Sequence, residues 1–181
     1  MHKNKDQPCL PPSAGRKGQS LVELIVVVAV IVIVVGALVF ATIASIRNAS
    51  FAKNQAQATK YAQEGLERVR SGRDRTYTIT GSFTLAGQVV DSWQDPDLWS
   101  NQISPNCNPC YFKLVSAPNT MMQHIGTSTT NAEIIGEFRR SIILSDSTST
   151  YTVEKTVTAL VSWTDFSGPH ESRLITILRK I

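Results

Sequence analysis

The chain has 181 residues, of which 42% are apolar and 18% charged, which is room for one ordinary domain and an accessory segment. Its formal net charge is +4, but residues 1–18 hold four basic residues and one acidic residue, a net +3, so the remainder carries only +1. This distribution argues against nucleic-acid binding, which needs basic residues clustered on a folded surface.

Residues 24–41 form a run of 18 residues without a charge or a hydroxyl group. A helix of this length can cross the hydrocarbon core of a bilayer. An isolated strand in lipid would leave its amides unpaired, so the run is predicted to be helical despite its many Val and Ile residues. Lys and Arg residues mostly precede the run, so the N-terminus is expected to stay in the cytoplasm. On hydropathy alone, a plain signal anchor fits equally well.

One acidic residue, Glu23, lies at the edge of this apolar run. A charged group near the centre of a membrane helix costs on the order of 2.5 kcal/mol, so it normally has a partner and a function. The alternative is that Glu23 only reaches the lipid headgroups. The run is longer than that of a secretory signal and no small-residue cleavage site closes it, so removal after the run is not expected.

Arg16, Lys17 and Gly18 precede Gln19, and Glu23 is the fifth residue counted from Gln19. This arrangement resembles the processing site of type IV prepilins and type II secretion pseudopilins. The resemblance implies cleavage between Gly18 and Gln19, followed by N-methylation of the new amine of Gln19, both by the prepilin peptidase and methylase. It also implies that Glu23 pairs with the N-terminal amine of a neighbouring subunit and so fixes the register of two packed helices.

The resemblance also implies where the chain resides and what it contacts. Its location would be the bacterial inner membrane, with a single span, followed by an extracellular or periplasmic fibre. Its partners would be the peptidase, other pilin or pseudopilin subunits, the inner-membrane assembly platform and the lipid bilayer. The family usually begins its processed chain with an aromatic residue or Met, whereas this chain has Gln19. Gly36 is the only candidate for a locally loosened turn in the fibre.

Beyond the apolar run, a helical pattern continues with a narrow apolar stripe. The stripe recurs at helical spacing and is expected to cover a sheet. Its members are Ala58, Tyr61, Ala62, Gly65, Leu66 and Val69. Ser71 and Gly72 are predicted to end the helix, because Gly is favoured just past a helix C-terminus. The end of this helix is similar to that of minor pilins and minor pseudopilins.

Three strands are predicted near the C-terminus. Residues 151–163 alternate with a period of two, residues 165–169 have turn composition, and residues 173–179 alternate again. Together with residues 137–144 they predict a three-stranded antiparallel meander. The fold class is therefore α+β: a long N-terminal helix, membrane-spanning in its first half and amphipathic in its second, packed on a C-terminal antiparallel sheet in a pilin-like layout.

The expected organisation is a leader at 1–18, a transmembrane helix at 19–46, an amphipathic helix at 47–72, a variable strand and loop region at 73–136, and the meander at 137–181. Within the variable region the only strand signal covers residues 111–115.

The cysteines are few. Cys9 would leave with the leader, and Cys107 and Cys110 remain outside the membrane, where oxidation is permitted. One such pair is too few for a tetrahedral zinc site, so no metal site is predicted. A loop disulfide between Cys107 and Cys110 is favoured over two free thiols or a redox-active pair.

Other candidate ligands give weak signals. Asp91, Asp95 and Asp97 could bind calcium, but their spacing matches no known loop, so a solvated acidic turn is favoured. His124 and His170 are interpreted as surface residues, and no catalytic constellation is present in the sequence.

The sequence thus predicts a minor type IV pilin or pseudopilin precursor, a structural subunit without cofactor and not an enzyme. The pilus or pseudopilus could serve adhesion, motility, secretion or DNA uptake. Two alternatives remain: a single-span anchored binding or sensor domain, and an extracytoplasmic thiol enzyme that uses Cys107 and Cys110.

Overall fold

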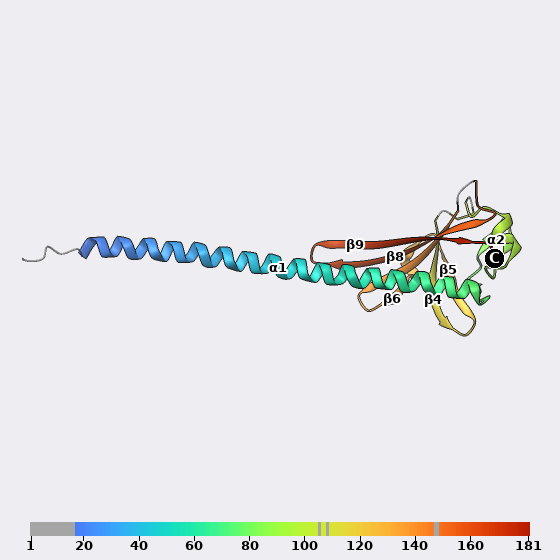
Figure 1. Ribbon diagram of the computed structural model, residues 1–181, viewed down its shortest axis with the longest axis horizontal. Helices are drawn as coiled ribbons and strands as arrows, with labels where there is room; N and C mark the ends of the chain where they lie inside the picture. Colours follow the sequence, from blue (N-terminus) through green and yellow to red (C-terminus); the bar gives the residue numbers. More distant parts are fainter. Residues whose placement is uncertain (1–16, 105, 108, 147–148) are drawn as a thin grey trace, which may run out of the picture. The chain divides into compact units, whose positions relative to one another are not determined.

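A computed structural model describes residues 17–181 except 105, 108, 147 and 148, and it describes side chains from residue 21 (Figure 1). Residues 1–16 of the expected leader, which include Cys9 and Arg16, lie outside the described residues. The chain divides into two units, residues 1–49 and 50–181, and each is described by itself.

Helix α1 (Lys17–Asp74) supplies all the described structure of the first unit. Nearly every side chain between residues 21 and 49 is exposed, although most are large and apolar. The hydroxyl of Thr42 donates to the carbonyl of Leu38 at 2.7 Å, so this polar group is satisfied within the helix. By length and composition, α1 can cross a membrane.

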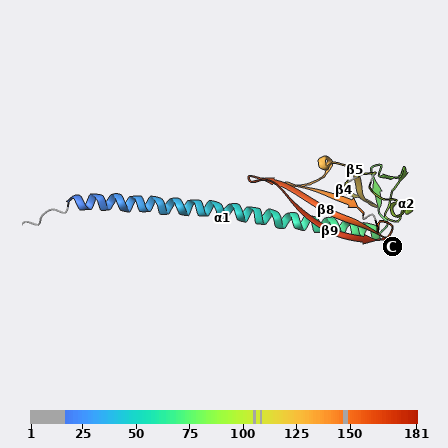
Figure 2. The same cartoon turned by 90° about the horizontal axis from the view of Figure 1, so that it is seen from above.

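The second unit combines the end of α1 with a seven-stranded sheet of order β1-β5-β4-β7-β8-β9, in which β6 also pairs with β7 (Figures 1 and 2). The strands of this sheet are β1 (Thr78–Thr80), β4 (Cys110–Ala117), β5 (Thr120–Gly126), β6 (Glu133–Ile135), β7 (Phe138–Ser145), β8 (Glu154–Asp165) and β9 (Gly168–Arg179). The smaller elements are the β2 (Thr84–Leu85) and β3 (Gln88–Val89) pair, helix α2 (Pro96–Ser100) and the 3-10 helix η1 (Thr129–Asn131).

The α+β class is confirmed, and the sheet is broader than the predicted meander. β7, β8 and β9 pair antiparallel in chain order, and β8 and β9 are joined by a two-residue turn after Asp165. β4 and β5 extend the same sheet, although only residues 111–115 carried a strand signal. β1 pairs parallel with β5, so the sheet is mixed and not purely antiparallel.

The predicted apolar stripe of α1 packs on the sheet. Ala58, Ala62 and Val69 are fully buried, and Leu66 nearly so. A Cβ placed on Gly65 would lie 3.7 Å from the Cβ of Ala159 on β8. Small residues along this stripe therefore let the helix backbone approach the sheet closely.

A buried arginine joins helix and sheet at this close approach. Arg140 on β7 is 1% exposed, and its guanidinium donates to the Tyr61 carbonyl of α1 at 2.9 Å. The same group pairs with the Glu133 carboxylate on β6 at 2.8 Å. A buried charge requires such partners, because leaving it uncompensated in the core is strongly destabilising.

Helix α1 ends two residues after the predicted stop at Gly72. Thr76 adopts a left-handed conformation (φ 58°), and the amides of Thr76 and Tyr77 donate to the carbonyls of Arg73 and Gly72. This is a Schellman arrangement in which Thr76 takes the position that glycine usually occupies. Gly72 has a different role, since a Cβ at this position would lie 2.2 Å from the Met121 sulfur and 3.0 Å from its Cβ.

Replacing Gly72 with Ala should therefore destabilise the second unit by about 1–3 kcal/mol, the usual cost of overpacking a core. The measurement is thermal unfolding of the detergent-solubilised full chain by tryptophan fluorescence, because Trp93, Trp99 and Trp163 are all buried in this unit. Gly36→Ala is the matched control, since nothing lies within 4 Å of a Cβ at Gly36. Equal unfolding temperatures for the two variants would contradict the close contact with Met121.

Candidate functional site

The residues predicted for processing lie at the start of α1. Gly18 and Gln19 fall within the first turns of the helix, which begins at Lys17. Glu23 is exposed on the same helix, four residues after Gln19. The pairing of Glu23 with a second subunit stays a prediction.

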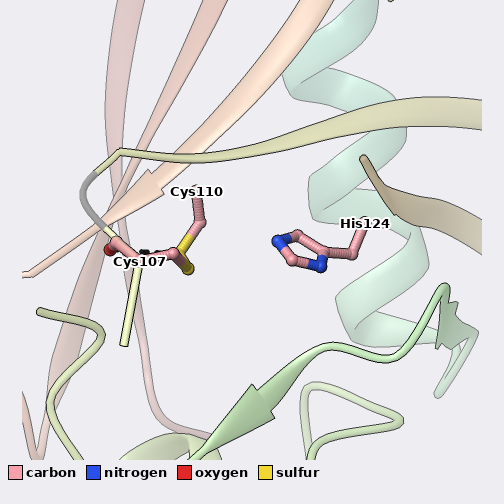
Figure 3. A group of neighbouring side chains, drawn as sticks. All are labelled: Cys107, Cys110 and His124. Atoms are coloured by element: carbon pink, nitrogen blue, oxygen red, sulfur yellow. Dashed lines mark hydrogen bonds between the residues drawn. A yellow bond between two sulfur atoms is a disulfide. The ribbon is translucent and has the colours of Figure 1, made fainter. Parts of the chain in front are cut away.

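Cys110 is the first residue of β4 and Cys107 precedes the strand, with their sulfurs joined and their Cα atoms 5.1 Å apart. Both are buried. His124 of β5 points toward the pair (Figure 3). The interpretation of His124 as a surface residue is wrong, because it is half-buried and its ring packs against the rings of Phe83 and Phe112 at centroid distances of 5.4 and 5.1 Å.

No sequence motif relates His124 to the cysteines, because the antiparallel pairing of β4 with β5 brings them together. Phe112 is the register partner of His124, and Cys110 is two residues before Phe112 on the same face of β4. The only sequence signal near this site was the strand pattern of residues 111–115. No strand was predicted at residues 120–126, so the position of His124 could not be inferred.

The three aspartates of the predicted acidic turn do not form a closely spaced group with one another in the described part of the chain. Asp95 caps helix α2, accepting from the Asp97 amide at 2.9 Å and from the Asp91 amide at 3.3 Å. Its carboxylate therefore serves the local backbone, as is common at helix N-termini.

His170 also has a local role. Its ring pairs with the Asp165 carboxylate at 3.0 Å beside the β8–β9 turn and stacks on Trp163.

A buried ion pair holds the segment that leads to Cys107. Lys155 of β8 is fully buried, and its Nζ donates to the Asp146 carboxylate at 2.9 Å and to the Asn101 carbonyl at 3.2 Å. The same Asp146 oxygen accepts from the Ile103 amide at 2.8 Å. The Ile103 carbonyl in turn accepts from the Cys107 amide. The Lys155–Asp146 ion pair thus ties β8 to Ile103, at the start of the segment that leads to Cys107.

Burial lowers the pKa of Lys155 from the ordinary lysine value of 10.5, and the hydrogen bond and charge of Asp146 oppose that shift. Because the lysine pKa is lower in the folded chain, the unfolded chain binds more protons than the folded chain between the folded-state pKa and 10.5. Stability from this group therefore rises as the pH increases through the folded pKa toward 10.5.

Asp146→Asn should leave the buried Lys155 charge without its carboxylate partner and lower the free energy of unfolding by about 3 kcal/mol at pH 7. The deficit should shrink as the pH is raised from about 7 to about 9.5, because the unpaired amine can deprotonate. The measurement is denaturant unfolding of the full chain across this range. Adding Lys155→Met to this variant should restore most of the stability, whereas a deficit that does not change with pH would contradict the role of Lys155.

The long apolar helix followed by a mixed sheet defines an α+β, pilin-like layout. Residues 13–39 match the prokaryotic N-terminal methylation motif, so the chain carries the type IV prepilin-like signal. This motif supports a type IV pilin or pseudopilin precursor and suggests a structural subunit. No curated protein and no solved structure matches the chain.

Proposed function

We propose that the chain is a minor type IV pilin or pseudopilin precursor that is processed at its N-terminus and assembled into a fibre. The single observation that carries this proposal is the methylation motif at residues 13–39, which covers Gly18, Gln19 and Glu23. The proposed steps are cleavage after Gly18 by the prepilin peptidase and methylation of the Gln19 amine. Neither step requires chemistry from the chain itself, so its proposed role is that of a substrate and building block.

Two features of the chain support assembly after processing. Residues 24–41 of α1 carry apolar side chains around the whole helix, which suits lipid and the apolar interior of a helical fibre alike. The second unit buries its own core around the end of α1, so it can fold while the first half of the helix remains in the membrane. The proposed route is residence in the inner membrane, with the N-terminus in the cytoplasm, followed by transfer into the fibre by the assembly platform.

Glu23 is the proposed assembly residue. It carries a negative charge next to an apolar run, and the cleaved amine of Gln19 in an adjoining subunit would supply a positive charge. A charge-assisted contact of this kind contributes about 1.5–3 kcal/mol and is worth more where water is excluded. It would also select one axial offset between neighbouring helices, since other offsets leave both charges unpaired in an apolar environment.

Processing is tested by the mass of the mature chain, purified from a host that contains a prepilin peptidase. We expect loss of residues 1–18 and a mass increase of one CH2 group on an N-terminal Gln19. Gly18→Val should block both changes, because the residue before the cut would gain a branched side chain. A functional chain that still begins at Met1 would favour the alternative, a single-span anchored domain that never polymerises.

Assembly is tested with Glu23→Gln, which keeps the size of the side chain and removes its charge. Loss of the contact should reduce recovery in sheared fibre fractions by about tenfold or more, with membrane insertion unchanged. The matched control is Thr42→Val, which also removes a polar group from the apolar segment, but one already satisfied by Leu38. Equal recovery of Glu23→Gln and wild type would contradict the pairing.

A further inference from the structure

The cysteine pair of the second unit lies beside a histidine from the neighbouring strand. The sulfurs of Cys107 and Cys110 and a ring nitrogen of His124 all lie within 4.8 Å of one another. Within the described residues, no other group of three His, Cys, Asp or Glu side chains brings its ligand atoms together in this way. Cys110 begins β4 and His124 lies near the end of β5, so the group lies at the base of the β4–β5 hairpin. The two cysteines are 8% and 0% exposed, so the group is not on an open surface.

One ring nitrogen of His124 makes a hydrogen bond, and the other makes none. A hydrogen bond joins the ring to the backbone of Gly81, while the Nε2 atom is buried and has no hydrogen-bond partner. A buried polar atom without a partner is costly, and native structures contain few of them. An imidazole that donates from one nitrogen to the backbone and offers its other nitrogen is the usual arrangement of a metal-binding histidine.

The neighbouring backbone fixes this placement. Gly81 has a φ of 90°, and a Cβ there would lie 2.5 Å from the backbone oxygen of His124. Only a residue without a side chain permits such an approach. Phe83 and Phe112 also pack against the ring. The imidazole is therefore held in position from several directions before any ligand arrives.

We propose that, when Cys107 and Cys110 are reduced, these two residues and His124 bind one thiolate-preferring metal ion, Cu+ or Zn2+. Two sulfur ligands and one imidazole suit both ions: Cu+ accepts soft sulfur ligands, and Zn2+ accepts three protein ligands with water in the fourth position. This assignment revises the expectation from sequence, which counted only the cysteine pair. It goes beyond the fibre role and does not depend on it.

The metal-bound state and the disulfide exclude each other. Binding converts two thiols to two thiolates, forms two metal–sulfur bonds and releases two protons. Forming the disulfide instead removes two electrons and two protons from the same thiols. An external disulfide compound takes them up and is reduced to two thiols by exchange. The loop therefore holds either a sulfur–sulfur bond or a metal ion, according to the supply of disulfide oxidant.

The test uses the full chain in detergent with Cys9 replaced by Ser, so that only the buried pair can react. The chain is reduced with a phosphine, separated from it without oxygen, and titrated with Zn2+ or Cu+ against a chromogenic chelator. We expect one equivalent of metal per reduced chain and none per disulfide-bonded chain. Titration with each ion separately shows which one the site prefers.

The contribution of the imidazole is tested with His124→Phe, which keeps an aromatic ring in contact with Phe83 and Phe112. Metal affinity should fall by at least about tenfold, and His170→Phe, the matched control at the β8–β9 turn, should bind like wild type. X-ray absorption of the metal-loaded wild type should show two sulfur ligands and one imidazole nitrogen. This second measurement decides the matter even if His124→Phe fails to fold. A reduced chain that binds no metal, or a ligand set without nitrogen, would overturn the proposal.

Discussion

The close approach of α1 to the sheet is the constraint on which the second unit depends. Ala58, Ala62 and Gly65 provide little side-chain volume, so the helix backbone lies near β7 and β8. Only at this distance can the guanidinium of Arg140 reach the Tyr61 carbonyl while it also pairs with Glu133. Bulkier residues in the stripe would separate the layers and leave a buried charge without one of its partners.

The distribution of apolar side chains around α1 differs between its two halves. Residues 24–41 are apolar on every side, a composition that suits a helix surrounded by lipid. Residues 58–69 are apolar on one side only, because a sheet covers that side and water the other. A single continuous element can therefore carry both a membrane segment and the core of a folded unit. The methylation motif at the first end and the sheet at the second are consistent with the requirements of a pilin precursor.

Long-range pairing gives the second unit its less expected features. β1 lies parallel to β5, and the β4–β5 hairpin extends the sheet beyond the C-terminal meander. This arrangement places Gly81, Cys110 and His124 around one position, although they are far apart in the chain. The ion pair of Lys155 and Asp146 ties the C-terminal strands to the chain that leads into the same loop. The loop is thus held both by the β4–β5 hairpin and by the C-terminal strands.

The sequence alone determined the features that depend on local composition. The run at residues 24–41 predicts a membrane helix, the 3.6-residue period predicts the stripe, and alternation predicts the last strands, because neighbouring residues face one environment. The residues of the N-terminal motif are also adjacent in the chain, so they could be identified directly. The tertiary structure alone decided the position of His124, the role of Gly72 and the helix end at Asp74, with Thr76 in the left-handed conformation. Each of these follows from a residue distant in the chain or from a backbone conformation that packing imposes, and no local pattern encodes either.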